Sequence, residues 1–196
     1  MAKKPSAVAT GFMAPVPIKS ILPINVGLSP AQEATMISIL GSPTTPLTTT
    51  CQNAKASAKV KDLQETRKMS DIFRLTGIRP ALDSVEKVLK TVFASNPDLA
   101  SVLSTEGMLC VRRRKPTNNT VSKKLSNHSW GTAVDFKIVG FDAPGNTKQD
   151  VPKFIALMIP LFNAEGWLSG IAFNDSMHFE VADETIKQWS KDGKLD

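Results

Sequence analysis

Apolar residues recur at helical spacing between Arg79 and Ser95, and polar residues fill the positions between them. The apolar residues that fall on one helical face are Leu82, Val85, Val88, Leu89, Val92 and Phe93. This spacing predicts an amphipathic helix whose apolar face is buried. The pair Asn96-Pro97 then favours a short second helix that runs to Leu103.

Signals for helix ends delimit one N-terminal helix. Ser29 is the expected N-cap, followed by Pro30 at the first helical position. Gln32 completes a capping box, and Gly41 ends the helix. Residues 42–66 are rich in threonine, proline and small side chains, and we expect a loop with little regular structure there.

Two further helices are expected in the C-terminal half of the chain. Asp150 is the predicted cap of one, which ends at Gly166. Asp183 is the predicted cap of the other, which spans residues 182–193. The apolar residues of the first are Phe154, Ile155, Leu157, Met158, Leu161 and Phe162.

Three short segments have β-strand character: residues 107–113, 131–140 and 177–181. Helices and short strands mix without a regular strand–helix–strand alternation, which favours an α+β fold. We expect a single domain with a small antiparallel sheet flanked by helices.

Composition divides the chain into three parts. Prolines at positions 15, 17 and 23 interrupt residues 1–25, which we expect to be a flexible leader. Residues 26–70 hold the N-terminal helix and an extended segment of unknown role. Residues 71–196 form the main domain, which carries the candidate chemistry.

The composition is that of a globular protein with one substantial core: 196 residues, 41% hydrophobic and 21% charged. The net charge of +6 and the pI near 9.4 suggest an anionic partner, such as nucleic acid, anionic lipid or a bacterial wall polymer. Charge alone does not choose among these partners.

No segment has the pattern of a membrane span or an export signal. The longest apolar run, residues 154–162, contains Pro160 and is far shorter than the ~20 residues of a membrane helix. The N-terminal prolines also break the apolar stretch that a cleaved signal requires. We therefore expect cytoplasmic synthesis without an export signal.

Cys51 and Cys110 are too few for a disulfide framework and lack metal-ligand spacing. We expect two free thiols, with a single disulfide as the alternative. No histidine lies near either cysteine in the sequence, so neither is a good candidate nucleophile.

The chain has only two histidines, and both lie in segments that also carry carboxylates. In "SNHSWGTAVDF", residues 126–136, Gly131, Ala133 and Asp135 share one face of the predicted strand. The two small residues leave space in front of the carboxylate. His128 precedes the strand, and its ring can turn back over that space. A histidine nitrogen and a carboxylate oxygen then converge with room for an ion.

The second histidine, His178, shares a strand face with Glu180, and Asp175 precedes both on the incoming loop. Two imidazoles and one carboxylate, with a fourth position for water, are the usual ligand set of a catalytic zinc site. The ligands would be His128, Asp135 and His178. A further carboxylate, Asp175 or Glu180, is needed to take the proton of the attacking water.

The same residues also allow simpler interpretations. A lone histidine is more often a core or surface residue than a ligand, and alternating small and large residues are ordinary in a sheet. Asp175 could belong to a turn, and Glu180 could be a solvated strand residue. Spacing alone leaves metal binding and ordinary packing equally open.

Together the two segments resemble the zinc D-alanyl-D-alanine carboxypeptidase and L-alanyl-D-glutamate endopeptidase family of peptidoglycan hydrolases. That family includes vancomycin-resistance peptidases and many phage endolysins. Its first motif, S-x-H-x-x-G-x-A-x-D, is present as Ser126, His128, Gly131, Ala133 and Asp135. Its second, an acidic residue shortly before a histidine that an aromatic residue follows, is present in residues 175–179. The resemblance covers residues 77–190 and does not explain residues 1–60.

The resemblance implies that the two histidines and Asp135 bind zinc, and that Asp175 is the general base. The carboxypeptidase branch typically has Glu at the position of Asp175, whereas Asp is frequent in the endopeptidase branch and favours it here. Glu180 is the alternative base, or a residue that orients a ligand imidazole. Ser126 is a second candidate for such a supporting role.

The family also uses an arginine upstream of the first motif to hold the substrate and stabilise the oxyanion. The sequence offers Arg112, Arg113 and Arg114, and Arg112 matches the family pattern best. Alternation along the segment would place Arg114 on the same face. The simpler interpretation of this run is a basic surface patch.

Residues 71–196 are therefore expected to be the catalytic domain of a zinc peptidase that cleaves an amide bond in the stem peptide of peptidoglycan, as an endopeptidase or a carboxypeptidase. We expect a monomer that binds no nucleic acid and acts on the cell wall as a lysin, after lysis or delivery. Two alternatives are a non-catalytic zinc-binding module of the same fold and a basic nucleic-acid-binding protein, which residues 110–124 suggest.

Overall fold

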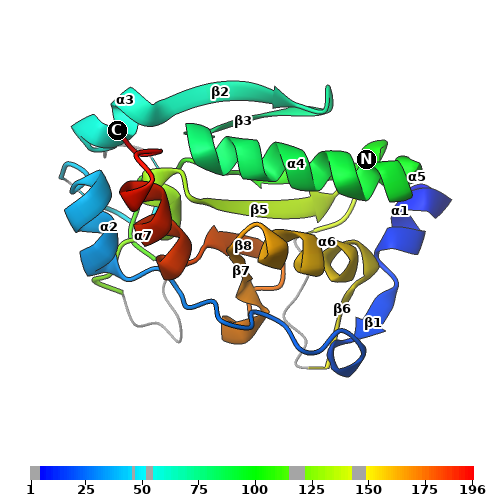
Figure 1. The fold of residues 1–196 in the computed structure, drawn as a ribbon. Helices are drawn as coiled ribbons and strands as arrows, with labels where there is room; N and C mark the ends of the chain where they lie inside the picture. Colours follow the sequence, from blue (N-terminus) through cyan, green and yellow to red (C-terminus); the bar gives the residue numbers. More distant parts are fainter. Residues whose placement is uncertain (1–4, 46, 52–54, 115–121, 143–148) are drawn as a thin grey trace.

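A computed structural model describes residues 5–45, 47–51, 55–114, 122–142 and 149–196 (Figure 1). Its helices and strands lie close together in one body. In chain order they are α1 (Ala7–Phe12), β1 (Pro15–Pro17), η1 (Ile18–Ser20), α2 (Glu33–Leu40), α3 (Ala58–Leu63), β2 (Gln64–Met69), β3 (Phe73–Ile78), α4 (Arg79–Ser95), α5 (Pro97–Ala100), β4 (Leu103–Gly107), η2 (Asn127–Trp130), β5 (Ala133–Ile138), β6 (Asp150–Pro152), α6 (Lys153–Ala164), β7 (Trp167–Ser169), η3 (Gly170–Phe173), β8 (His178–Val181) and α7 (Asp183–Lys191).

The main sheet has four antiparallel strands in the order β4-β5-β8-β7. Helix α6 covers one face of it, because Phe162 of this helix packs on Phe136 of β5 and Phe179 of β8, with ring centroids 5.9 and 4.3 Å away. Helix α4 in turn packs on α6 (Figure 1). Side chains alternate along a strand, so the neighbours of these phenylalanines point to the opposite face. The fold is a single α+β domain, as the sequence predicts.

Helix α4 confirms the amphipathic prediction. It spans Arg79–Ser95 with Pro80 in its first turn. The predicted apolar face is buried, apart from the half-buried Phe93. The short helix after it ends at Ala100 rather than Leu103, where β4 begins.

The predicted start of the N-terminal helix is wrong. The N-cap of α2 is Gln32, whose side chain makes no capping hydrogen bond. The main-chain N–H of Ser29 donates to Glu184, and that of Gln32 donates to Asp183, both over 2.9 Å. Carboxylates of the distant helix α7 thus replace the expected local capping box. Gly41, with φ of 79°, ends the helix as predicted.

The loop expected over residues 42–66 contains regular structure. Helix α3 and the first residues of β2 lie within it. Val60 and Leu63 of α3 are buried, so the segment contributes to the core. The sequence does not reveal these two positions, because the segment is poor in apolar residues and a helix of six residues is too short to show a periodicity.

The strand expected over residues 107–113 is also misplaced. The strand is β4, Leu103–Gly107. The chain leaves the sheet at Gly107, whose φ is 103°, and makes an isolated bridge between Arg113 and Leu125 further on. A segment whose residues favour a β-strand can thus be extended without pairing to a neighbouring strand.

The capping role predicted for Asp150 is wrong, and that for Asp183 is displaced. Asp150 lies in β6, which pairs with β1, so α6 starts only at Lys153 with Pro152 as N-cap. Asp183 is the first residue of α7 and Ala182 its N-cap. Helix α6 contains Pro160, and no helix within the described part of the chain is long and apolar enough to cross a membrane.

Residues 5–25 contain more structure than the expected flexible leader. They include α1, and β1 pairs with β6. At their end, the N–H of Asn25 donates to Asn163 over 2.8 Å, and the Asn25 amide donates to the Ser169 carbonyl over 2.9 Å. Residues 1–4 of the expected leader lie outside the described residues.

Cys51 and Cys110 form a disulfide, so the expectation of two free thiols is wrong. Their Cα atoms are 5.2 Å apart, within the usual range for such a bond. The bond closes a loop with a sequence separation of 59 residues. By loop-closure entropy, a loop of this length stabilises the fold by about 4 kcal/mol.

Candidate metal centre

His128 reaches the sheet through a turn that requires glycine. It lies in η2, and Gly131 follows with a left-handed φ of 64°. A Cβ at Gly131 would lie 2.9 Å from the Cα of Gly77. Both the backbone conformation and the close approach exclude a side chain there. This turn carries the His128 ring to the open face of β5.

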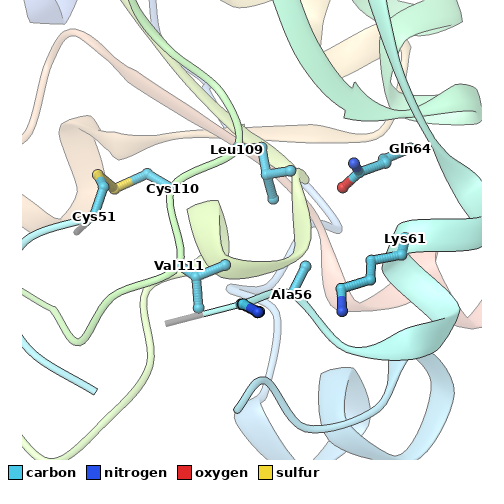
Figure 2. A pocket seen from close by; sticks show the side chains of 8 residues that line it. Cys51, Ala56, Lys61, Gln64, Leu109, Cys110 and Val111 are labelled. Atoms are coloured by element: carbon cyan, nitrogen blue, oxygen red, sulfur yellow. A yellow bond between two sulfur atoms is a disulfide. The ribbon is translucent and has the colours of Figure 1, made fainter. Parts of the chain in front are cut away.

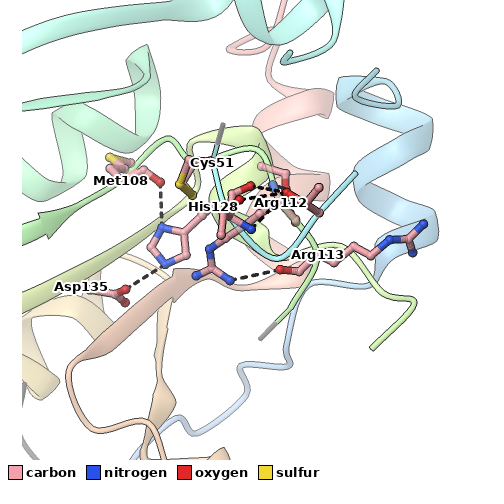
Figure 3. The surroundings of a disulfide bond; sticks show 10 residues. Cys51, Met108, Arg112, Arg113, His128 and Asp135 are labelled. Carbon is pink, nitrogen blue, oxygen red and sulfur yellow. Dashed lines mark hydrogen bonds and ion pairs between the residues drawn. A yellow bond between two sulfur atoms is a disulfide. The ribbon is translucent and has the colours of Figure 1, made fainter. Parts of the chain in front are cut away.

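The His128 ring is fixed by a main-chain acceptor. Its Nδ1 lies 2.8 Å from the carbonyl oxygen of Met108 (Figure 3). A carbonyl can only accept, so Nδ1 carries the hydrogen, and in the neutral ring Nε2 keeps its lone pair. Nε2 lies 3.2 Å from Asp135 Oδ2, yet it is buried and makes no hydrogen bond of acceptable geometry.

Asp135 and His178 are directly opposite residues on the neighbouring strands β5 and β8. Ala133 is likewise opposite Glu180. Opposite residues share a face, so all four side chains lie on the face that α6 does not cover. Ala133 leaves space beside the carboxylate of Asp135, as the sequence predicts.

The three predicted ligands come together. Nδ1 of His178 lies 2.8 Å from Asp135 Oδ1. One ligand atom from each of His128, Asp135 and His178 lies within 4.8 Å of the other two. The two histidine rings meet edge to face with centroids 5.1 Å apart. Both histidines are almost fully buried.

The charges of the cluster are strongly coupled. Burial raises the pKa of Asp135, but the interactions with His128 and His178 outweigh it and hold this pKa well below its usual range. Burial lowers the pKa of His178, but Asp135 and Glu180 outweigh it and raise this pKa to about 10. In the metal-free protein, a proton on His178 therefore takes the place of a cation between the carboxylates.

The donor set fits a divalent cation such as zinc. Nε2 of His128 and Nδ1 of His178 both face Asp135, while the opposite nitrogen of each ring is held by an acceptor, Met108 O or Glu180. Such an acceptor behind each ligand imidazole fixes its tautomer and orientation in metal sites. The unpaired buried Nε2 of His128 is a lone pair that a cation would satisfy.

Glu180 lies behind His178 and not in front of the cluster. Its Oε2 is 3.0 Å from His178 Nε2, and its side chain is buried. This position suits the orienting role among the two that the sequence left open. Ser126, the other candidate supporting residue, contributes main-chain contacts: its N–H donates to Arg112 O and its carbonyl accepts from Ser129.

Asp175 lies in the turn that leads into β8. Its N–H donates to Gly170 O over 2.9 Å, and its carbonyl accepts from the N–H of His178 over 3.1 Å. A Cβ at Gly170 would lie 2.3 Å from this carbonyl, so the tight turn also requires glycine. Asn174, at φ of 61°, completes it. The turn fixes the backbone of Asp175 next to a predicted ligand.

Arg112 is half-buried and interacts electrostatically with the cluster. Burial lowers the pKa of its guanidinium, and the charges of Asp135 and Asp175 oppose this shift. Its main chain is tied to η2, because the N–H of Arg112 donates to Ser129 Oγ and the same hydroxyl donates to Arg112 O (Figure 3). The predicted arginine is thus grouped with a predicted ligand and the predicted base.

The two other arginines of the run are used elsewhere. The guanidinium of Arg113 donates to the carbonyls of Leu47 and Lys123. Nε of Arg114 donates to Leu125 O over 3.1 Å. Both side chains therefore link main-chain segments that lie next to each other. Residues 115–121 of the basic run lie outside the described residues.

Sequence reasoning missed several residues that build the centre. Met108 contacts His128 through its main-chain carbonyl, and the Ser129 hydroxyl donates to the main-chain carbonyl of Arg112. Because each contact involves a main-chain group, no side-chain motif indicates it. Phe173 is 43% exposed, and its ring packs against His178 with centroids 5.6 Å apart. A single exposed phenylalanine at the end of the short helix η3 gives no motif in the sequence either.

Comparison with known proteins agrees with the resemblance. The model of the D-alanyl-D-alanine carboxypeptidase family matches residues 120–181. This part of the chain is similar to that family. No curated protein and no solved structure matches the chain.

The D-alanyl-D-alanine carboxypeptidase match contains both histidines, Asp135, Asp175 and Glu180, and leaves Arg112 outside. It supports a peptidase, and the His128, Asp135 and His178 cluster fits the metal site of one.

Proposed function

We propose that the protein is a zinc-dependent peptidase that hydrolyses an amide bond in the stem peptide of peptidoglycan. The observation that carries the proposal is the convergence of His128, Asp135 and His178 within 4.8 Å, in a segment that matches the model of a carboxypeptidase family. Two neutral imidazoles and one carboxylate are typical of catalytic zinc, because they leave a coordination position for solvent.

Each of these residues would have a distinct task. A zinc ion held by His128, Asp135 and His178 would act as a Lewis acid on the scissile carbonyl and acidify the attacking water. Asp175 takes the proton of that water and passes it to the leaving amine. Arg112 donates hydrogen bonds to the oxygen on which negative charge develops.

Asp175 is preferred to Glu180 as the base. Glu180 is only 5% exposed and is engaged by His178 Nε2, so it has no path to a substrate-bound water. Asp175 is half-buried, and its charge acts on Arg112, the residue proposed to contact the substrate. A base must lie within reach of the proton that it removes.

The partner proposed is the cell wall itself. The net charge of +6 favours adhesion to anionic wall polymers. We infer that the protein acts as a lysin that meets the wall after lysis or delivery. The aspartate at position 175 favours the endopeptidase type over the carboxypeptidase type.

Purified peptidoglycan tests the proposal directly. The zinc-loaded protein is expected to release fragments whose masses identify the cleaved bond, a chelator to stop their release, and added zinc to restore it. Mass analysis separates the two types, because a carboxypeptidase releases free D-alanine and an endopeptidase opens the stem or a cross-link. A protein that binds zinc but releases no fragment would be the non-catalytic module.

The nucleic-acid alternative is tested in parallel. It requires tight binding that weakens steeply with salt and ignores chelators. Arg113 and Arg114 donate to main-chain carbonyls, so these two guanidinium groups are partly occupied. Retention of the protein on DNA or RNA at physiological salt would contradict the peptidase proposal only if no wall fragment is released.

A further inference from the structure

Residues 108–112 contact the predicted ligand His128 and its turn at alternate positions, 108, 110 and 112. The carbonyl of Met108 accepts from His128 Nδ1 over 2.8 Å. The N–H of Cys110 donates to His128 O over 2.9 Å. Arg112 exchanges two hydrogen bonds with Ser129. The position of this segment therefore sets both the orientation of a ligand ring and the place of the proposed oxyanion-binding arginine.

No strand ladder fixes this segment, although Met108 and Val111 are buried. Strand β4 ends at Gly107, and residues 108–112 belong to no strand. They contact β3 through a hydrogen bond from Leu109 N–H to Thr76 O over 2.9 Å and through the Met108 side chain, which lies against Gly77. A cavity of about 290 Å³ lies against Leu109, Cys110 and Val111 (Figure 2), so side chains do not fill this side of the segment.

Residues 33–51, which we call the brace, hold the site segments from outside. The described part of the brace, which leaves out residue 46, contacts the segment around η2 and the residue that follows Arg112. Glu33 accepts from the N–H of Leu125 over 2.9 Å, and Gly41 O accepts from Trp130 Nε1 over 2.8 Å. Thr48 O accepts from the N–H of Arg113 over 2.7 Å.

The covalent link between the brace and the site segment is the Cys51–Cys110 disulfide. We propose that this disulfide is a positioning element of the metal centre. It fixes Cys110 midway between Met108 and Arg112, and so it holds the acceptor behind His128 and the arginine in one arrangement. Residues 109–111 border a cavity, so without the disulfide this segment can shift toward it. The effect on Arg112 rests on the proposed function, whereas the effect on metal binding does not.

The test compares the double variant Cys51→Ala/Cys110→Ala with Leu89→Ala. Leu89 is fully buried in α4, which contributes no residue to the candidate centre, so this variant controls for a general loss of stability. Circular dichroism and thermal unfolding establish the temperature at which both variants are folded. Zinc affinity is measured there by competition with a chromophoric chelator, and hydrogen exchange reports the protection of the Cys110 amide.

The double variant is expected to bind zinc at least about tenfold more weakly than wild type, as in other sites that lose support behind a ligand. The main-chain amide at position 110 exchanges faster in this variant, and kcat/KM on peptidoglycan falls together with zinc affinity. Leu89→Ala keeps wild-type zinc affinity. Unchanged zinc affinity in the folded double variant, or an equal loss in Leu89→Ala, overturns the proposal.

Reduction of the folded wild-type protein covers the case in which the double variant does not fold. A water-soluble phosphine gives two electrons to the disulfide, two thiols form, and the phosphine becomes its oxide with oxygen from water. Faster exchange of the Cys110 amide in the reduced protein supports the proposal, and unchanged exchange overturns it. If wild type binds zinc but cleaves no wall bond, the proposed function fails while the exchange and affinity results still decide the disulfide's role.

Discussion

Nε2 of His178 lies 3.0 Å from Oε2 of Glu180, on the side of the ring away from Asp135. A carboxylate can only accept, so this contact places a hydrogen on Nε2 and leaves Nδ1 for a metal ion. Glu180 thereby determines which nitrogen of His178 can be a ligand. The buried carboxylate also makes the imidazole a stronger donor to the metal.

Replacement of this carboxylate is expected to weaken metal binding. In Glu180→Gln the amide oxygen can still accept from His178, but the negative charge is gone. We expect zinc affinity to fall about 10–100-fold, measured by chelator competition. Glu106→Gln, on the exposed side of β4, is the matched control and should bind zinc like wild type. Equal affinities in both variants would show that Glu180 does not orient the ligand.

Metal binding should release a proton. His178 has a pKa of about 10 in the metal-free protein and carries a proton below that pH. That proton must leave before Nδ1 can bind zinc. Apparent zinc affinity should therefore rise as pH increases from about 6.5 to 8, by about tenfold per unit.

Calorimetry in buffers of different ionisation enthalpy measures the proton release directly. About one proton per zinc is expected at pH 7. An affinity that does not change with pH, with no proton released, would mean that His178 is neutral before the metal arrives.

A substitution can distinguish the role of the general base from that of the metal ligands. Asp175→Asn removes the proton acceptor and leaves His128, Asp135 and His178 in place. Zinc content should be unchanged while kcat falls about 10²–10⁴-fold. Asp142→Asn, an exposed carboxylate, is the control. Full activity in Asp175→Asn would move the role to another group, with Glu180→Gln as the next variant to assay.

Arg112 is expected to act on the transition state. Arg112→Ala should lower kcat/KM about 10²–10³-fold, because a donor to the developing oxyanion is lost. Arg112→Lys should recover only part of this, since lysine lacks the planar fork. The neighbouring Arg113→Ala serves as control, because its guanidinium binds main-chain carbonyls. Similar losses in both alanine variants would indicate a general effect of the basic run.

The turn after η2 should not tolerate a side chain. In Gly131→Ala a Cβ meets the backbone of Gly77 at 2.9 Å, and the φ of 64° disfavours alanine. A loss of about 1–3 kcal/mol in the free energy of unfolding is expected from backbone strain alone. Urea unfolding measures it. Gly11→Ala in α1 meets nothing within 4 Å and should be neutral or slightly stabilising.

Local periodicity predicted the elements whose signals are long and regular. Helix α4 appears where its apolar stripe predicts it, and strands β5 and β8 lie within the predicted segments. The start of α2 could not be predicted in the same way, because Asp183 and Glu184 satisfy the N–H groups near its beginning. Those carboxylates are about 150 residues away in sequence, and local capping rules see only neighbours.

The sequence by itself determined the side chains of the candidate centre: two histidines and Asp135, with Asp175 and Glu180 beside them. Alternation along the two strands places Asp135 on one face of its strand and His178 with Glu180 on one face of the other, while His128 and Asp175 lie just before these strands. The family motifs that these residues match then indicated a metal site. Only the tertiary structure decided what supports them, namely Met108 O behind His128, Glu180 behind His178, and the Cys51–Cys110 link. The carbonyl of Met108 and the cysteine partner are far from these residues in sequence, and the Glu180 contact depends on how the His178 ring is turned, so all three are defined only when the chain has folded.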